Sequence, residues 1–259
     1  MMLGVGIENA QYDLAEVLPH FASGALAEVR DAHAIGVLFR QLGLCKLFSL
    51  GSAEPLFVAQ MQAVSAYVHR LPALAHDDLV TSWAGVFWDA VGGEYFDAAS
   101  TIAGHARGTH NRAWEHEDDF LHVWFVMNRY FLGASDDRQR ALLDRWEVVL
   151  EGAFDPRWLL DDALLRGDDE GFREAFIDVA DDREVRLREQ VAEGSLTDDI
   201  AVWFVPFWAE GLALLRLAER DGLRTDQHCK MVPNVTRRPN PFAYDPEAWR
   251  SIEFKPRRR

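Results

Sequence analysis

The sequence has little cysteine, with only Cys45 and Cys229 in 259 residues. Two thiols form neither a disulfide framework nor a cysteine-rich metal cluster, and free thiols are typical of a reducing compartment. No stretch reaches 18 apolar residues without a charge, and the first 30 residues lack a basic segment followed by an apolar run. We therefore expect no membrane span and no signal peptide, which indicates a cytoplasmic protein.

The sequence also lacks the alternating Val, Ile and Thr runs with hairpin turns that predict β-strands. Apolar residues instead recur every three or four positions, which is the spacing of amphipathic helices. This pattern predicts an all-α fold of about nine or ten helices, arranged as a multi-helix bundle or as irregular stacked helical hairpins. Nine segments carry this pattern clearly, over residues 24–48, 53–70, 77–91, 114–132, 136–150, 157–166, 169–179, 182–192 and 198–222, and two shorter ones, 12–18 and 95–105, carry it weakly.

The most apolar of these segments, residues 198–222, is expected to be a long buried helix around which the others pack. Thr197 supplies an N-cap and Gly222 a C-terminal stop. A helix that is apolar on nearly every side belongs inside a protein. Pro206 removes one backbone donor, so we predict a bend near the aromatic block Trp203–Trp208.

The domain organisation is predicted to be one helical domain over residues 1–230, followed by an extended tail over 231–259. The domain could also consist of two stacked halves, about 1–110 and 111–230, because segments 77–90 and 198–211 align with a one-residue gap. Chance would produce the same match between two aromatic helices with acidic caps. The tail holds five of the ten prolines and is expected to wrap on the body through Val232, Phe242, Tyr244 and Trp249.

The net charge is −15 and unevenly distributed. Residues 237–259 carry seven basic and three acidic side chains, which leaves −19 on residues 1–236. An acidic body repels nucleic acid and anionic membranes and attracts basic proteins, although solubility alone would also account for it. The basic tail is expected to neutralise part of this charge within the same chain.

The acidic residues are densest between residues 161 and 199, where fourteen acids face five arginines. Helix capping needs one or two acids per helix, and this segment exceeds that number. The alternative is a solvated face with Glu–Arg pairs. We predict that the following acids bind a basic partner: Asp161, Asp162, Asp168, Asp169, Glu170, Glu174, Asp181 and Asp182, together with Glu117, Asp118 and Asp119.

The candidate for enzymatic chemistry is a histidine-rich segment that contains His105, His110, His116 and His122. Asp118 and Asp119 lie four and three residues before His122, so on a helix they would share its face as metal ligands do. The order HEDDFLH is not HExxH, however, and solvated histidines beside an acidic helix start are the alternative.

Other catalytic patterns are absent from the sequence. It has no GxSxG, no P-loop and no GxGxxG after a strand. Cys45 lies on an apolar helix face, which favours a buried thiol. Glu210 stands in the most apolar helix and would need a partner or a raised pKa if buried. We therefore assign no catalytic residue, metal or cofactor.

The C-terminal half resembles the Imm49-type immunity proteins found beside bacterial polymorphic toxins. The resemblance covers about residues 159–239 and consists of LLRGD (164–168), Phe172 and Phe176, DDRE (181–184), LALLRLAERDGL (212–223) and MVP (231–233). It implies an all-α cytosolic protein, without catalytic residues, that binds and neutralises one cognate toxin, often a nuclease. The tail after Pro239 departs from the family pattern.

The leading hypothesis from the sequence is thus an immunity protein whose acids cover the basic surface of a toxin. The alternatives are a metal-dependent enzyme that uses the His116–His122 region and a helical-repeat adaptor protein.

Overall fold

The computed structural model describes residues 2–259, and this part of the chain forms eleven α-helices and no β-strand. The all-α prediction is confirmed. The helices are α1 (Met2–Ala22), α2 (Val29–Leu50), α3 (Glu54–Arg70), α4 (Gly85–Gly92), α5 (Phe96–His105), α6 (Glu117–Tyr130), α7 (Asp136–Leu150), α8 (Pro156–Arg166), α9 (Asp169–Ala192), α10 (Asp198–Phe204) and α11 (Ala209–Arg220). Four short 3₁₀ helices are η1 (Leu71–Ala73), η2 (His76–Asp78), η3 (Asn234–Arg237) and η4 (Ala248–Arg250).

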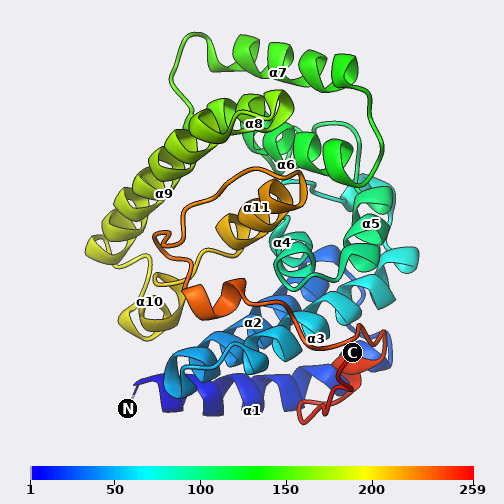
Figure 1. The fold of residues 1–259 in the computed structure, drawn as a ribbon. Helices are drawn as coiled ribbons and strands as arrows, with labels where there is room; N and C mark the ends of the chain where they lie inside the picture. The colour runs from blue at the N-terminus through cyan, green and yellow to red at the C-terminus, as the bar shows by residue number, and fades with distance from the viewer. Residues whose placement is uncertain (1) are drawn as a thin grey trace.

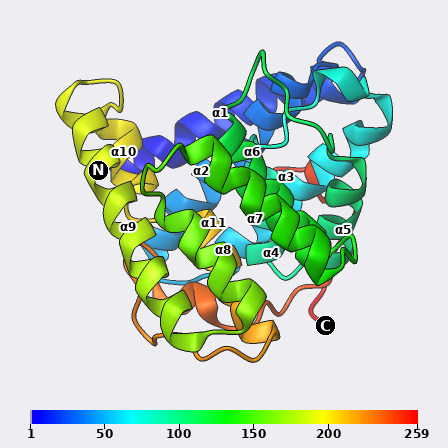
Figure 2. The same ribbon diagram turned by 90° about the horizontal axis from the view of Figure 1, so that it is seen from above.

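The helices form layers (Figure 1). Helices α1, α2 and α3 make the base, with α2 in contact with both of its neighbours. Helices α4, α5 and α11 lie above it, and α6, α7, α8 and α9 form the opposite side of the molecule. Seen from above, α7, α8 and α9 lie in front, with α1, α5 and α10 visible around them (Figure 2).

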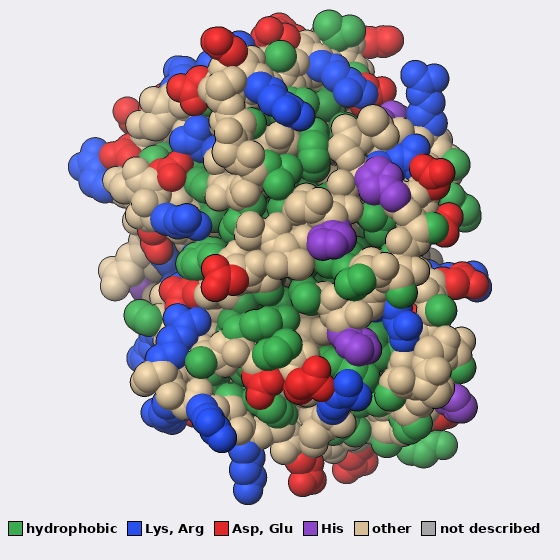
Figure 3. Space-filling model, turned by 90° about the vertical axis from the view of Figure 1, so that its right-hand side faces the viewer, with side chains coloured by type: hydrophobic (Ala, Val, Ile, Leu, Met, Phe, Trp, Pro, Cys, Tyr) green, Lys and Arg blue, Asp and Glu red, His purple; other side chains and the backbone are tan. Residues whose placement is uncertain are grey.

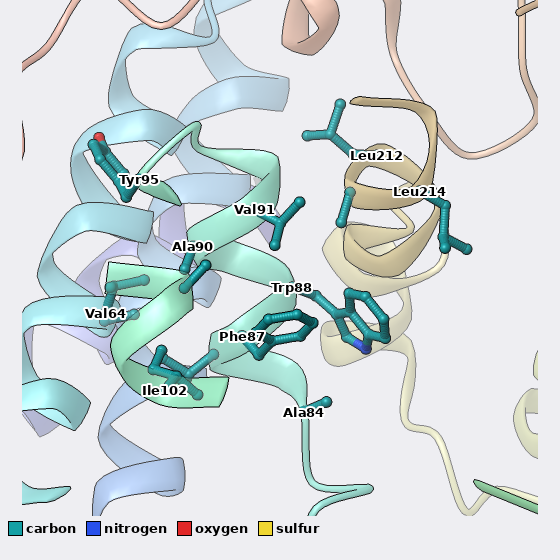
Figure 4. Close-up of a cluster of buried hydrophobic side chains, with 14 of the residues drawn as sticks. Val64, Ala84, Phe87, Trp88, Ala90, Val91, Tyr95, Ile102, Leu212 and Leu214 are labelled. Atoms are coloured by element: carbon teal, nitrogen blue, oxygen red, sulfur yellow. The ribbon is translucent and has the colours of Figure 1, made fainter. Parts of the chain in front are cut away.

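The centre of the core is the short helix α4, which lies between α3 and α11. Its side chains Phe87 and Trp88 are buried together with Leu212 and Leu214 of α11 (Figure 4). A glycine ends this helix, and the Tyr95 hydroxyl then donates to the Phe57 carbonyl of α3 at 2.8 Å. The core thus joins helices from both ends of the chain.

The predicted long buried helix over 198–222 is wrong, because the structure divides it into α10 and α11. Pro206 has no N–H to donate, and the N–H of Trp208 donates to the Met231 carbonyl at 2.7 Å instead of continuing the helix. The expected bend is therefore a full break over residues 205–208. Helix α11 lies in the core, whereas α10 buries only Trp203 there and packs against α1 and α2.

An 18-residue stretch within Asp198–Arg220 has a mean hydropathy of 1.5, so its length and composition would allow it to cross a membrane. In the folded protein 56% of that stretch is buried inside the molecule. Its place in and beside the core accounts for the apolar composition.

Two other helices are longer than predicted. Helix α1 spans Met2–Ala22 rather than residues 12–18. Its Gly6 lies against α2 so closely that a Cβ there would be 2.7 Å from the Cys45 sulfur. Helix α9 is one continuous helix over Asp169–Ala192, where the sequence predicted two separate ones.

The predicted helix from residue 77 is also wrong, since α4 begins only at Gly85. The segment before it is held in an irregular form by the loop that follows α5. The Asn111 amide donates to the Leu79 carbonyl at 3.3 Å, and the Ser82 N–H donates to the Glu115 carboxylate at 2.8 Å. These bonds satisfy backbone groups that a helix would have paired internally.

The remaining predicted helices correspond to α2, α3, α5, α6, α7 and α8. Helix α2 begins at Val29 and α6 at Glu117, later than predicted, whereas α7 begins at Asp136, as predicted. The Ser135 hydroxyl there accepts the Arg138 N–H, and Gly167 ends α8 in the left-handed region.

The C-terminal segment lies against the α3 layer. Trp249 is 1% exposed, its backbone N–H donates to the Ser65 hydroxyl at 3.0 Å, and its ring meets Phe21 edge-on. Val232 and Phe242 are also buried, and Tyr244 is partly buried. Two basic residues of the segment pair with acids of the body: Arg258 with Glu54 and Arg237 with Glu219.

Candidate functional site

A buried group of charged side chains is centred on His122. Its Nδ1 lies 3.0 Å from Oδ2 of Asp161 in α8, and its Nε2 lies 3.1 Å from Oε1 of Glu210 in α11. His122 itself is in α6 and is 3% exposed, and the rings of Trp88 and Trp146 lie beside it. The cluster therefore joins three helices that are distant in the sequence.

The pKa values in this cluster are strongly shifted. Burial alone would lower the pKa of His122, but the carboxylates of Asp161 and Glu210 outweigh it and raise that pKa to about 10. Burial raises the pKa of Asp161 to about 6 despite the neighbouring imidazolium. Burial opposes ionisation of Glu210 as well, yet its hydrogen bond to His122 holds its pKa below the usual range. At neutral pH an imidazolium lies between two carboxylates.

The geometry of this cluster suits structure rather than proton transfer. Both ring nitrogens of His122 are engaged, so neither is free to accept a substrate proton. The two carboxylates lie against opposite nitrogens of one ring and cannot converge on a single ion. Among residues 2–259 no three His, Cys, Asp or Glu side chains are grouped to hold a metal.

The predicted histidine constellation is dispersed in the structure, which contradicts the shared face expected for Asp118, Asp119 and His122. His122 points inward, whereas both aspartates turn outward and bind Arg157. His116 is the exposed N-cap residue of α6. The rings of His105 and His110 each bond to a nearby backbone carbonyl, at Thr101 and Glu115 respectively.

Arg157, at the start of α8, links this buried cluster to the surface. Its guanidinium donates to Asp118 at 2.8 Å, to Asp119 at 2.6 Å and to Asp155 at 2.7 Å. Burial favours the protonated form of Asp155, but the Arg157 guanidinium holds the pKa of that carboxyl below its usual range. Asp155 also caps α8 by accepting the Arg157 N–H at 2.9 Å.

Next to Arg157 is a surface groove of about 470 Å³, here named the acidic groove. It lies between the start of α6, the α7–α8 connection and the middle of α9. Five carboxylates and two guanidinium groups line it, with an apolar rim; the residues are Asp118, Asp155, Asp178, Asp181, Asp182, Arg157, Arg186, Leu150, Phe154 and Pro156. Phe154 is 73% exposed, which is unusual for a phenyl ring.

Three of the predicted partner-binding acids, Asp118, Asp181 and Asp182, meet in this groove. For two other predicted acids the expected position at the surface is wrong. Asp161 is 0% exposed and binds His122, and Asp162 is 8% exposed and pairs with Arg140 and Arg166. Both lie on the inner face of α8, which is covered by its neighbouring helices.

The other predicted acids lie at the surface outside the groove. Several have local partners: Glu117 with Arg145, Asp119 with Arg157, Asp168 as the N-cap of α9, and Asp169 with Arg224. Glu170 and Glu174 are exposed on the outer side of α9. They share no pocket with the groove residues.

Sequence reasoning did not single out Asp155, Asp178 and Phe154, which line the acidic groove. Asp178 lies three and four residues before Asp181 and Asp182, and this helical spacing could have placed it on the same face. Phe154 and Asp155 are in a loop, where no periodicity predicts which side chains are exposed.

The acidic excess does not cover the molecule evenly. The face on the α5 side shows acidic and basic side chains interspersed with hydrophobic surface and several histidines (Figure 3). That face is therefore neither uniformly acidic nor uniformly basic.

No family model, curated protein or solved structure matches this chain. The resemblance to Imm49-type proteins thus depends on the motifs between residues 159 and 239 alone.

Proposed function

We propose that this protein is a binding protein that holds a basic segment of a partner protein in the acidic groove, as an immunity protein neutralises its cognate toxin. The observation that supports this proposal is the convergence of Asp118, Asp155, Asp178, Asp181 and Asp182 around one groove. Arg157, Arg186 and the Lys230 ammonium, which pairs with Asp181, offset three of its five negative charges, so the groove keeps a net charge of −2 and favours a cationic occupant.

The exposed Phe154 adds an anchor to this charge. Interfaces derive most of their affinity from a few aromatic or arginine side chains surrounded by polar contacts. A phenyl ring at the rim of an acidic groove suits a partner in which apolar and basic side chains alternate. A nuclease toxin has such a basic surface, because it must bind phosphate groups.

The net charge of −15 supports the same function in a second way. A strongly acidic protein attracts a basic partner over distances near the Debye length and speeds its association. This long-range attraction acts mainly on the association rate, whereas contacts inside the groove determine the dissociation rate.

The experiment compares two double variants of α9 with the same change in charge. Asp178→Lys/Asp182→Lys alters the groove, and Glu170→Lys/Glu174→Lys alters the same helix outside it. The ligand is the protein encoded by the adjoining gene, since an immunity gene stands beside its toxin gene. Association and dissociation rates are measured by surface plasmon resonance at two salt concentrations, and protection of growing cells is scored in parallel.

We expect the groove variant to weaken binding by about 100-fold and the control variant by about threefold, because an interfacial charge pair contributes a few kcal/mol and long-range charge less. Phe154→Ala should raise the dissociation rate with little effect on association. Equal weakening by both double variants would mean that net charge alone acts. Full protection by the groove variant would exclude this groove, and a partner that is harmless to cells would favour the adaptor hypothesis.

A further inference from the structure

A second concave site lies on the other side of α9, between that helix and the segment 224–230, here named the strap. It encloses about 240 Å³. Its floor is apolar and consists of Phe172, Phe176, Ile177 and Ala180 from α9 and Leu215 from α11. These α9 residues recur at helical spacing and form one apolar stripe, in which Phe172, Phe176 and Ala180 are at most 4% exposed and Ile177 is 46% exposed.

The strap is fixed to α9 at both ends. At one end the Arg224 guanidinium lies 2.7 Å from Asp169, which also accepts the Arg224 N–H at 3.0 Å. At the other end the Lys230 ammonium lies 2.5 Å from Asp181 and 2.9 Å from Glu184. The chain between these anchors therefore bridges the floor instead of collapsing onto it.

A third constraint holds the strap away from the floor. Directly after it, Met231 has a φ of +55° and its carbonyl accepts the Trp208 N–H at 2.7 Å. Arg237 donates to the Asp226 carbonyl inside the strap. A non-glycine residue in the left-handed region persists only where surrounding contacts hold it. The pocket is thus built into the fold.

The rim of this pocket is rich in hydrogen-bond donors. Arg173 and Lys230 carry positive charge, and Nδ1 of His228 lies 2.8 Å from the Asn234 amide nitrogen. Asp226 is the one carboxylate in the lining. Arg173 has only a distant pairing with Glu170, at 3.6 Å, so its donors are available to a ligand.

We propose that this pocket binds a small carboxylic acid with an apolar body, such as a medium-chain fatty acid or an aryl carboxylate. An apolar cavity of about 150 Å³ already holds benzene, so this pocket has room for a substituted ring or a chain of about eight carbons. The apolar body lies against Ile177, the exposed apolar residue of the floor, and the carboxylate accepts from Arg173.

The test uses octanoate, octan-1-ol and octylamine, which share one chain and differ in the charge of the head group. Binding to the full chain is measured by isothermal titration calorimetry. Wild-type protein should bind octanoate at least about tenfold more tightly than the alcohol, and octylamine least. No saturable binding of octanoate, or tighter binding of octylamine, overturns the proposal.

Two variants locate the ligand. Ala180→Phe fills the floor and should weaken the binding of octanoate by at least about tenfold. Val185→Phe, at an exposed position of the same helix, should leave the affinity for octanoate unchanged. Arg173→Gln should abolish the preference for octanoate over octanol, and Arg138→Gln on α7 should preserve it. Wild-type affinity in Ala180→Phe contradicts the proposal.

A measurement on wild-type protein guards against a variant that fails to fold. Cys229 lines the pocket and is partly exposed, whereas Cys45 is fully buried. Saturating octanoate should slow the reaction of Cys229 with a chromogenic disulfide reagent by at least about fivefold, since the chain shields the sulfur. An unchanged rate would exclude this pocket.

Discussion

Nδ1 of His122 lies 3.0 Å from Oδ2 of Asp161, and neither side chain has access to solvent beyond 3%. The two residues are 39 positions apart and come from α6 and α8. Glu210 of α11 completes the cluster at the other ring nitrogen. A buried group of charges stabilises a fold only while it is complete, because one removed partner leaves the others unpaired in a medium of low dielectric.

Replacing His122 by Leu should therefore cost about 3–5 kcal/mol of the free energy of unfolding, since Asp161 would remain fully buried and Glu210 partly buried without their shared cation. Urea unfolding followed by tryptophan fluorescence measures the loss. His105→Leu provides the control at an exposed histidine of α5, and it should stay within about 0.5 kcal/mol of wild type. A loss below about 1 kcal/mol for His122→Leu would contradict the ion cluster.

Stability should also depend on pH through His122. Its pKa is raised from 6.5 to about 10, so the folded protein keeps this proton at pH values where the unfolded chain has released it. The free energy of unfolding then falls as the pH rises from 6.5 towards 10, by up to about 1.4 kcal/mol per pH unit for one proton. Urea titrations between pH 6.5 and 9.5 measure this slope. If the free energy of unfolding falls with the same slope against pH in wild type and His122→Gln, His122 does not have the raised pKa.

The contact between α2 and α3 depends on a glycine. A Cβ at Gly43 would lie 2.6 Å from the Cβ of Ala59 and 3.2 Å from the Cα of Leu56, which are rigid atoms. Gly43→Ala should therefore destabilise the protein by about 1–3 kcal/mol, as overpacking does. Gly104 of α5 has no atom within 4 Å of the same position, and Gly104→Ala should be neutral or stabilise by up to about 1 kcal/mol. Thermal unfolding measures the midpoint temperature of both variants. Equal shifts of that temperature would contradict the close approach of α2 and α3 at Gly43.

The C-terminal segment should contribute to the stability of the whole domain. Trp249→Ala removes a buried indole that packs on Phe21 and should cost about 3–5 kcal/mol. Trp114→Ala, at a 66% exposed tryptophan, is the matched control and should cost about 0.5 kcal/mol or less. If a urea titration finds both variants equally stable, the segment does not pack on the body in solution.

The sequence by itself determined the features that depend on local interactions. Apolar spacing predicted the all-α class, and Thr197 and Gly222 marked the start of α10 and the end of α11, because caps act within one turn. It also located the acidic segment, although composition could not say which acids lie at the surface. One side of each helix packs against other helices, and those helices are far away in the sequence.

The tertiary structure decided the rest. It turned Asp161 inward to His122 while Asp178, on a different helix, faces the acidic groove. It also interrupted the apolar segment 198–222 at Pro206, where the Trp208 N–H donates to the carbonyl of Met231 in the C-terminal segment. Periodicity describes one helix alone, whereas burial, ion pairing and such long-range hydrogen bonds depend on which other helices the finished fold places beside it.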